Sequence, residues 1–443
     1  MRKSIGFISF RASNEVHPLS TWVSILHSFM KTKKAAASPS PTPSPAGTPS
    51  GFSRRQMLSG ASLAALGLAA TDGFTRVLSP SAQAAPAKEG SKIEPLEDFI
   101  FDIENSSGGW RGPAGTATEA TVEEFPVSQS IAGVSMRLNP GGFRELHWHS
   151  IAAEWAYVLE GRVRTTVISP NGTTATDDFE VGDIWYFPKG HGHMLQCVGD
   201  KACHFLLGFD SGHFSEFGTF SITDWVSHTR PDIIARNLGL PLETVQKFSK
   251  KELYIGAGAI ALDQKPKNID STIEPSQNPH KFRLIDVRPE EFPGGSIRVC
   301  SQKEFPINST LTSALMTLKP GAFRELHWHP NADEWQYVIK GSGQLTNFGS
   351  HSRVKTMDYS KGMVAFIKQG YGHFIENTGP EDLEVLILFS APDYQEISLS
   401  AWLAANPVQL VADHFGLDPS VVAKLPTRRI GISAKQEKTE ITN

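Results

Sequence analysis

The stretch Pro140-Gly-Gly-Phe-Arg-Glu-Leu-His-Trp-His149 occurs again as Pro320-Gly-Ala-Phe-Arg-Glu-Leu-His-Trp-His329, 180 residues further along the chain. The same offset, without a gap, relates other chemically distinctive residues in the two halves. These pairs are Glu154 and Glu334, Trp155 and Trp335, Tyr157 and Tyr337, Gly161 and Gly341, Gly182 and Gly362, and His193 and His373. Chance does not produce such a repeat, which indicates two copies of one fold.

Each copy has the pattern of an antiparallel β-sheet domain. In the first copy, short apolar, β-branched and aromatic runs alternate with Gly, Pro and Asn-Gly turns. Helices are expected after the strands, at 223–225 and 232–238 in the first copy and at 399–415 in the second. We therefore predict an all-β protein of two jelly-roll domains, each a double-stranded β-helix with a C-terminal helical appendage.

The repeat also places the domain boundaries. We expect an N-terminal domain at 86–264, a polar, Pro-containing linker at 265–279 and a C-terminal domain at 280–428. Residues 1–52 include a Pro/Ser/Ala/Thr-rich run with little to bury, and these residues and the tail at 429–443 are expected to be disordered or flexible. The segment 93–127 is too polar to form a core alone and is expected to be an arm over a neighbouring chain.

An export signal is predicted at residues 53–85. Ser53-Arg-Arg-Gln-Met-Leu58 precedes a small-residue apolar stretch, and Ala82-Gln-Ala84 offers an A-x-A cleavage site. This resembles a bacterial twin-arginine signal, which implies a mature protein in the periplasm or outside the cell. A membrane anchor is the alternative, but Gly67 interrupts the apolar stretch, which is shorter than the roughly 20 residues that span a bilayer.

The composition excludes some classes of partner. The chain has 443 residues and a net charge of −4, without the basic stripe that a phosphate backbone requires, so we expect no nucleic acid partner. Cys197, Cys203 and Cys300 show no CxxC spacing. We interpret them as buried small apolar residues rather than disulfides or zinc ligands.

Two metal sites are predicted from the histidines and one glutamate of each copy. Residues i and i+2 of a strand project from one face, so the two histidines of each His-Trp-His point together. An isolated pair would fit a core or a surface equally well, but four ligand types recur here at the same spacings. Without a thiolate they suit Mn, Fe, Ni or Zn. The sets are His147, His149, Glu154 and His193, and His327, His329, Glu334 and His373.

This doubled pattern of H-W-H, E and G-H resembles the bicupin family and, within it, the oxalate decarboxylases. The resemblance runs from about residue 125 to residue 425 and includes Phe143-Arg-Glu-Leu146 and the phrase at 214–225. It implies conversion of oxalate to formate and carbon dioxide, two Mn²⁺ per chain bound by the eight ligands, and dioxygen as co-catalyst. It also implies a homo-oligomer, a trimer or a hexamer. Arg144 would be catalytic and bind substrate at the first site, and Arg324 would bind substrate at the second.

A charge count agrees with these arginines. Mn(II) with one glutamate carries +1, an arginine raises this to +2, and oxalate is a dianion, so the complex is neutral and avoids an uncompensated buried charge. Arg144 has another interpretation, an ordinary surface ion pair with Glu145. It stands three residues before His147, on the opposite face of an ideal strand. A bend or bulge around Gly141 and Gly142 would therefore be needed.

Ser215-Glu-Phe-Gly218 resembles the lid over the amino-terminal site of the family, which implies that Glu216 is the proton shuttle. Relatives that oxidise oxalate lack this acid. Two other functions stay open, an oxalate oxidase or another cupin dioxygenase, which Glu216 disfavours, and a non-catalytic metal-binding bicupin, which two intact ligand sets disfavour.

Three departures from the family pattern stand out. Phe217 and Gly218 follow the lid glutamate, where polar residues are usual, and Glu154 follows His147 by seven residues rather than six. The strand at 385–389 has no carboxylate near the second metal. We therefore expect the C-terminal site to be structural or to assist. The ligands alone do not identify the metal.

Overall fold

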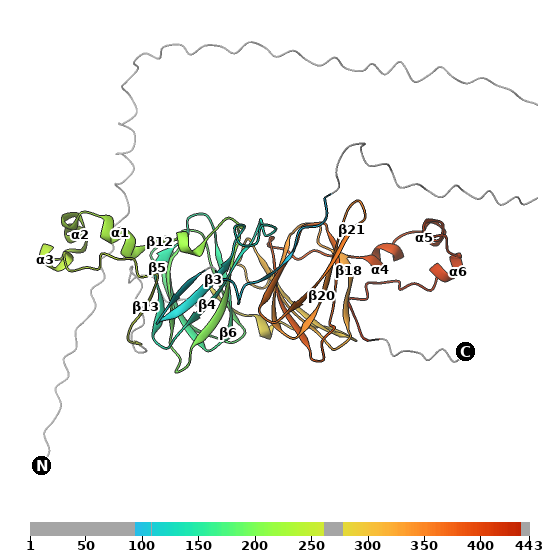
Figure 1. The fold of residues 1–443 in the computed structure, drawn as a ribbon, viewed down its shortest axis with the longest axis horizontal. Helices are drawn as coiled ribbons and strands as arrows, with labels where there is room; N and C mark the ends of the chain where they lie inside the picture. The colour runs from blue at the N-terminus through green and yellow to red at the C-terminus, as the bar shows by residue number, and fades with distance from the viewer. Residues whose placement is uncertain (1–93, 108, 261–277, 436–443) are drawn as a thin grey trace, which may run out of the picture. The chain divides into compact units, whose positions relative to one another are not determined.

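The computed structural model describes residues 94–107, 109–260 and 278–435, which form two antiparallel β-domains with short helices (Figure 1). The expected export signal at 53–85, the extension at 1–52 and most of the linker at 265–279 lie outside the described residues. The all-β fold with two related domains is confirmed.

Two sheets make up the N-terminal domain. One has the strand order β14-β9-β6-β11-β4-β3-β2, and the other has the order β12-β5-β10-β7-β8 with β13 also paired to β5. Gly172, at a φ of 83°, lies in the predicted hairpin turn between β7 and β8. The strands are β2 Trp110–Gly112, β3 Gly115–Ala120, β4 Ala132–Leu138, β5 Gly142–Trp148, β6 Glu154–Glu160, β7 Arg162–Ile168, β8 Thr174–Glu180, β9 Asp183–Phe187, β10 Gly192–Cys197, β11 Cys203–Phe209, β12 Phe220–Ser221, β13 Ile255–Ala257 and β14 Lys281–Arg283.

The C-terminal domain repeats this plan. Its sheets have the orders β1-β22-β19-β24-β17-β16-β15 and β21-β20-β23-β18-β25, with β26 also paired to β18. The strands are β1 Ile100–Asp102, β15 Glu290–Phe292, β16 Gly295–Cys300, β17 Thr312–Leu318, β18 Phe323–Trp328, β19 Glu334–Lys340, β20 Ser342–Gly349, β21 Arg353–Ser360, β22 Met363–Ile367, β23 Gly372–Glu376, β24 Leu383–Phe389, β25 Ile397–Ser398 and β26 Ile432–Ser433.

The two domains exchange an edge strand. β1, which precedes the N-terminal domain, pairs with β22 of the C-terminal domain, whereas β14 follows the linker and pairs with β9 of the N-terminal domain. Phe99 and Ile103 are buried in the core of the C-terminal domain. The expectation that 93–127 is an arm over a neighbouring chain is therefore wrong for its described part, which packs within this chain.

Three short helices follow the sheets of each domain. They are α1 Ile222–His228, α2 Pro231–Leu238 and α3 Leu242–Val245 in the first, and α4 Leu399–Ala404, α5 Val408–Phe415 and α6 Pro419–Val422 in the second. The continuous helix expected at 399–415 is interrupted because Pro407, the N-cap of α5, has no N–H for the preceding turn. Both α2 and α5 end at a glycine in the left-handed region, Gly239 and Gly416.

The chain end corrects a second expectation. We placed 429–443 in a flexible tail, but β26 pairs with β18 and Ile432 is fully buried. Residues up to 435 are described, so the part of the tail next to the barrel belongs to the C-terminal sheet.

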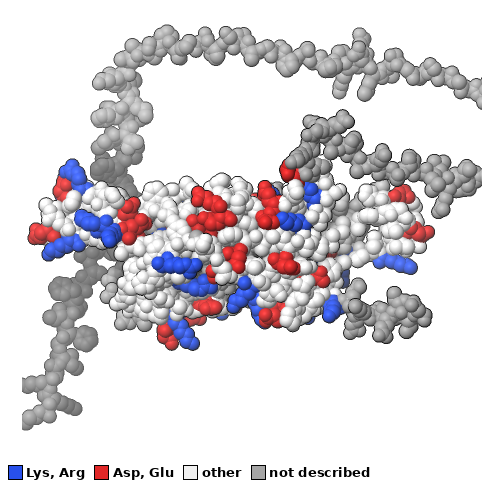
Figure 2. Space-filling view, viewed as in Figure 1, with Lys and Arg blue, Asp and Glu red and all other residues white. Residues whose placement is uncertain are grey.

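Apolar side chains fill the first barrel, while a second core extends from the C-terminal barrel to Trp155 and Tyr157 of the N-terminal domain. All three cysteines are buried and free, as predicted. Acidic and basic side chains are interspersed on the face in Figure 2, which shows no continuous basic stripe. Among the described residues, no helix has the length and apolarity needed to cross a bilayer.

Candidate active site

The structure brings each predicted set of four ligands together. Within each set, the candidate ligand atoms all lie within 4.8 Å of one another, and all eight residues are buried. At the first site, His147 on β5 stands opposite His193 on β10 in the strand register. His149 follows β5, and Glu154 begins β6. The seven-residue spacing to Glu154 therefore still delivers its carboxylate to the histidines.

The hydrogen bonds at the first site leave one nitrogen of each imidazole directed at the centre. The Nδ1 atoms of His147 and His193 lie 2.6 and 2.8 Å from the carbonyl oxygens of Glu145 and His191. The Nε2 atoms of His147 and His149 are buried without a hydrogen-bond partner among the described residues. Burial, together with the nearby Arg144 guanidinium, lowers the pKa of His147 well below its usual value. A neutral imidazole with a free Nε2 is the form that binds a divalent metal.

Trp185 orients the glutamate of the first site. Its indole Nε1 donates to Glu154 Oε1 at 2.7 Å, and the other carboxylate oxygen lies 3.2 Å from His193 Nε2. One oxygen is thus held from behind while the other faces the cluster. This arrangement of three imidazoles and one carboxylate suits manganese.

The second site has the same ligands with a different support. Gln336 Nε2 donates to Glu334 Oε1 at 2.6 Å, and Glu334 Oε2 lies 2.9 Å from His329 Nε2 and 3.1 Å from His373 Nε2. The Nδ1 atom of His329 is 2.7 Å from the carbonyl oxygen of Gln395. Burial alone would raise the pKa of Glu334, but the adjacent His373 and His329 hold it well below its usual range.

A β-bulge places Arg144 on the ligand face. His193 pairs with His147 and Leu195 pairs with Arg144, so two residues on β10 match three on β5. The extra residue reverses the alternation, and the fully buried Arg144 lies beside the cluster. The expected bend at Gly141 and Gly142 is replaced by this bulge between residues 144 and 147. The C-terminal domain has the same irregularity between Arg324 and His327.

Glu216 lies over the first site on a 3-10 turn, Glu216–Gly218, and is fully buried. Arg144 Nε donates to its Oε1 at 2.8 Å, and its Oε2 is 3.3 Å from His149 Nε2. Burial alone would raise the pKa of Glu216, but the Arg144 guanidinium outweighs it and holds the pKa well below the usual value. Glu216 is therefore an ionised partner of the substrate arginine in this closed arrangement. Arg144 is not paired with Glu145.

The lid is anchored by Glu119, which the sequence did not single out. Its carboxylate accepts from Ser215 Oγ at 2.9 Å and from the backbone N–H of Glu216 at 3.1 Å. Beyond the glutamate, Phe217 is partly exposed and packs on Tyr254, while a Cβ at Gly218 would meet nothing within 4 Å. A cavity of about 220 Å³ beside the lid is lined by His149, Phe214 and Gly218, among others.

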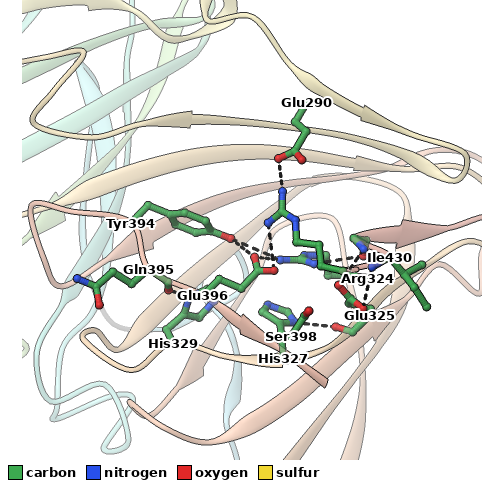
Figure 3. A network of polar contacts seen from close by, with 12 residues as sticks. Glu290, Arg324, Glu325, His327, His329, Tyr394, Gln395, Glu396, Ser398 and Ile430 are labelled. Atoms are coloured by element: carbon green, nitrogen blue, oxygen red, sulfur yellow. Dashed lines mark hydrogen bonds and ion pairs between the residues drawn. The ribbon is translucent and has the colours of Figure 1, made fainter. Parts of the chain in front are cut away.

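A second glutamate covers the C-terminal site (Figure 3). Glu396 is buried and forms an ion pair with Arg324, as Glu216 does with Arg144. The absence of a carboxylate from the strand at 385–389 therefore does not leave this site without one. The repeat offset of 180 residues that relates the ligands also relates Glu216 to Glu396, and this signal would have identified it.

Comparison with known proteins gives a consistent result. The cupin family profile matches residues 104–246 and 288–423. Oxalate decarboxylase OxdC of Bacillus subtilis (strain 168) is 41% identical over 303 residues, covering 68% of this chain and 78% of that protein. The chain belongs to the oxalate decarboxylase family of bicupins. A probable oxalate decarboxylase of Arthroderma benhamiae is 34% identical over 322 residues, covering 72% of this chain and 77% of that protein.

The family is also evident from solved structures. One of Bacillus subtilis oxalate decarboxylase, studied for the EPR fine structure of its Mn(II) centers, matches with a TM-score of 0.71 and 37% identity. The match covers 78% of this chain and 90% of that chain. Both domains and both ligand clusters of this family member therefore lie within the region of likeness.

Proposed function

We propose that the protein is an oxalate decarboxylase that uses manganese and dioxygen and converts oxalate to formate and carbon dioxide at the N-terminal site. The observation that carries the proposal is the position of Glu216, which is buried, 2.8 Å from the Arg144 guanidinium and 3.3 Å from His149. An acid, a substrate-binding cation and a metal cluster thus meet in one closed space. The two ligand clusters hold two Mn²⁺ per chain.

Oxalate binds by taking the place of Glu216 on Arg144. The arginine is fully buried, and a buried charge without a partner costs several kcal/mol. Exchange of one carboxylate for another keeps the guanidinium paired throughout. The glutamate swings aside on the short lid, where the open space at Gly218 gives the backbone room to move.

Glu216 then becomes the proton carrier. Once it leaves Arg144 and stands beside a substrate anion, its ionised form loses the contact that favours it, so it takes the proton that hydrogen oxalate brings. When the carbon–carbon bond of oxalate breaks, one half leaves as carbon dioxide, and the other receives this proton on carbon and becomes formate. Manganese, when bound, supplies the Lewis-acid and one-electron chemistry for which dioxygen is the co-catalyst. The closed lid excludes water from this transfer.

Glu216→Gln tests the proposal because it keeps the side-chain volume and removes the acid. Formate production from oxalate should fall by roughly a hundredfold or more, while manganese content stays at the parental level. Glu243→Gln, an exposed glutamate on α3, is the matched control and should leave the rate unchanged. Formate production within about twofold of the parent in Glu216→Gln would show that another group delivers the proton. Hydrogen peroxide as the main product of the parent would favour an oxidase instead.

Export by the twin-arginine route is proposed from Arg54 and Arg55 and the apolar segment that follows them. This route carries folded proteins, so manganese is inserted before export. Replacement of both arginines by lysine should retain the protein in the cytoplasmic fraction, with the precursor at full length. Unchanged export of this variant would contradict the proposal.

We also propose a homo-oligomer, a trimer or a hexamer, with a second copy of this chain covering the helical appendages. Trp225 on α1 and Trp402 on α4 are 62% and 55% exposed and stand next to exposed Leu146 and Leu326 of the ligand-bearing strands. Apolar surface of this kind is stable in water when a partner covers it. Light scattering at micromolar concentration should give three or six times the mass of the mature chain. A monomeric mass would contradict it.

A further inference from the structure

Three donors hold Glu396 over the C-terminal site (Figure 3). Its carboxylate forms an ion pair with Arg324, accepts from the Tyr394 hydroxyl, and lies 3.2 Å from an Nη atom of Arg429. Arg429 is paired in turn with Glu290 on β15. The glutamate is therefore fixed to a different strand and to the chain end, besides its own segment.

The charges within this cluster balance. Arg324 and Arg429 contribute two positive charges, and Glu396 and Glu290 contribute two negative ones. The side chains of Arg324 and Glu396 are almost completely buried. A dianion arriving at Arg324 finds no excess positive charge among these four groups. It would have to displace a carboxylate that keeps two other partners.

The N-terminal site provides an internal comparison. Arg144 stands opposite Ile255 on β13, and Arg324 stands opposite Ile432 on β26. Counting back three residues from each isoleucine, Arg429 corresponds to Glu252. The offset of 180 residues matches Tyr394 with Phe214.

Two of the three donors on Glu396 therefore have no equivalent at the first site. Phe214 has no hydroxyl, and Glu252 carries the opposite charge to Arg429. Among the described residues, Arg144 is the one Lys or Arg side chain paired with Glu216. The lid glutamate of the first site has a single cation to leave, whereas Glu396 is held by three groups.

The space at the two sites differs in the same direction. The cavity at the C-terminal ligands, lined by Arg324, Glu334 and Tyr394, has a volume of about 10 Å³. This is about the space of one water molecule. The cavity beside His149 and the N-terminal lid is about 220 Å³.

From these contacts we infer that Glu396 is a built-in carboxylate occupant of Arg324, held there by Tyr394 and Arg429, and that it keeps oxalate out of the C-terminal site. The inference rests on the proposed function in taking oxalate as the substrate. Arg324, which the sequence predicts to bind substrate, is on this reading a partner of the protein's own glutamate. The two sites then share their ligands but differ in access.

The test counts the oxalate molecules bound per chain. Manganese-loaded full-length protein is dialysed to equilibrium against radiolabelled oxalate under argon, since without dioxygen the substrate is not consumed. The parent should bind one oxalate per chain. Tyr394→Phe combined with Arg429→Glu, which gives the C-terminal site the residues of the N-terminal one, should bind two, with the affinity of the added site raised at least about tenfold. Arg428→Glu is the control, because it makes the same charge change at the exposed neighbouring residue; it should bind one.

Glu396→Gln keeps the result decisive if the double variant fails to fold. It preserves side-chain volume, releases one unpaired positive charge at Arg324, and should also bind two oxalates while retaining two manganese ions per chain. A parent that already binds two, or a Glu396→Gln protein with full manganese that still binds one, would overturn the inference. A parent that binds none, and makes no formate in air, would contradict the proposed function instead.

Discussion

Trp185→Phe should weaken manganese binding at the N-terminal site alone. The indole Nε1 of Trp185 donates to Glu154 Oε1 at 2.7 Å, and both residues are fully buried. The substitution leaves a buried carboxylate oxygen without its donor, which costs about 1.5–3 kcal/mol for a hydrogen bond to a charged group. That range corresponds to a loss of roughly ten- to a hundredfold in metal affinity, the usual effect of removing a group that orients a ligand.

Selectivity follows from the different support of the two glutamates. Glu334 is held by Gln336, whereas the repeat counterparts of Trp185 and Gln336 are Ala365 and Ala156. Neither alanine offers a side-chain donor. Loss of the indole therefore has no direct effect on the C-terminal ligands.

Titration of the manganese-loaded protein with a chelator, followed by metal analysis, measures the effect. Trp185→Phe should release one of its two ions at a chelator concentration roughly ten- to a hundredfold lower than the parent needs. Trp155→Phe is the matched control, because it removes the same atoms from a buried tryptophan whose Nε1 has no hydrogen-bond partner among the described residues. Equal weakening of both ions, or an equal effect of Trp155→Phe, would refute the reasoning.

Other perturbations test separate parts of the structure. His149→Ala removes one of four ligands and should abolish manganese at the first site together with formate production; full metal content by elemental analysis would disprove the ligand assignment. Burial raises the pKa of Glu119 to about 7 from 4.5, so the closed lid favours its neutral form, and closure should weaken as the pH rises through about 7. Glu119→Gln, neutral throughout, should flatten the fall in kcat/KM for oxalate above neutral pH, and an unchanged profile would contradict the latch. Phe99→Ala should lower the free energy of unfolding by about 3–5 kcal/mol in urea titration if β1 completes the C-terminal sheet; a change below about 1 kcal/mol would argue against this packing.

The ligands were predictable because they follow short-range rules. The i, i+2 alternation of a strand places His147 beside His149, and the internal repeat supplies a second instance. The position of Arg144 was harder to derive. Its face depends on a bulge opposite β10, and β-bulges have no single residue signature when glycine does not form them.

The missed features depend on long-range pairing. Arg429 reaches Glu396 because β26 adds to β18, across more than a hundred residues of sequence, and nothing local to Ile432 distinguishes a strand from a tail. The exchange of β1 and β14 between domains is of the same kind. Glu396 itself was within reach of the repeat, but attention to the strand at 385–389 placed the expected carboxylate on the wrong element.

Duplication explains why the two sites differ where they do. Loss of any one ligand from either cluster would leave buried imidazoles or a buried carboxylate without partners, which destabilises the barrel itself. The ligand sets are therefore constrained twice, by metal binding and by folding. The groups around the lid glutamates lie at the ends of the barrels, where Phe214 or Tyr394 and Glu252 or Arg429 are accommodated without change to the sheets. Divergence at these two positions changes how firmly a carboxylate holds its arginine, and it does so without disturbing the metal ligands.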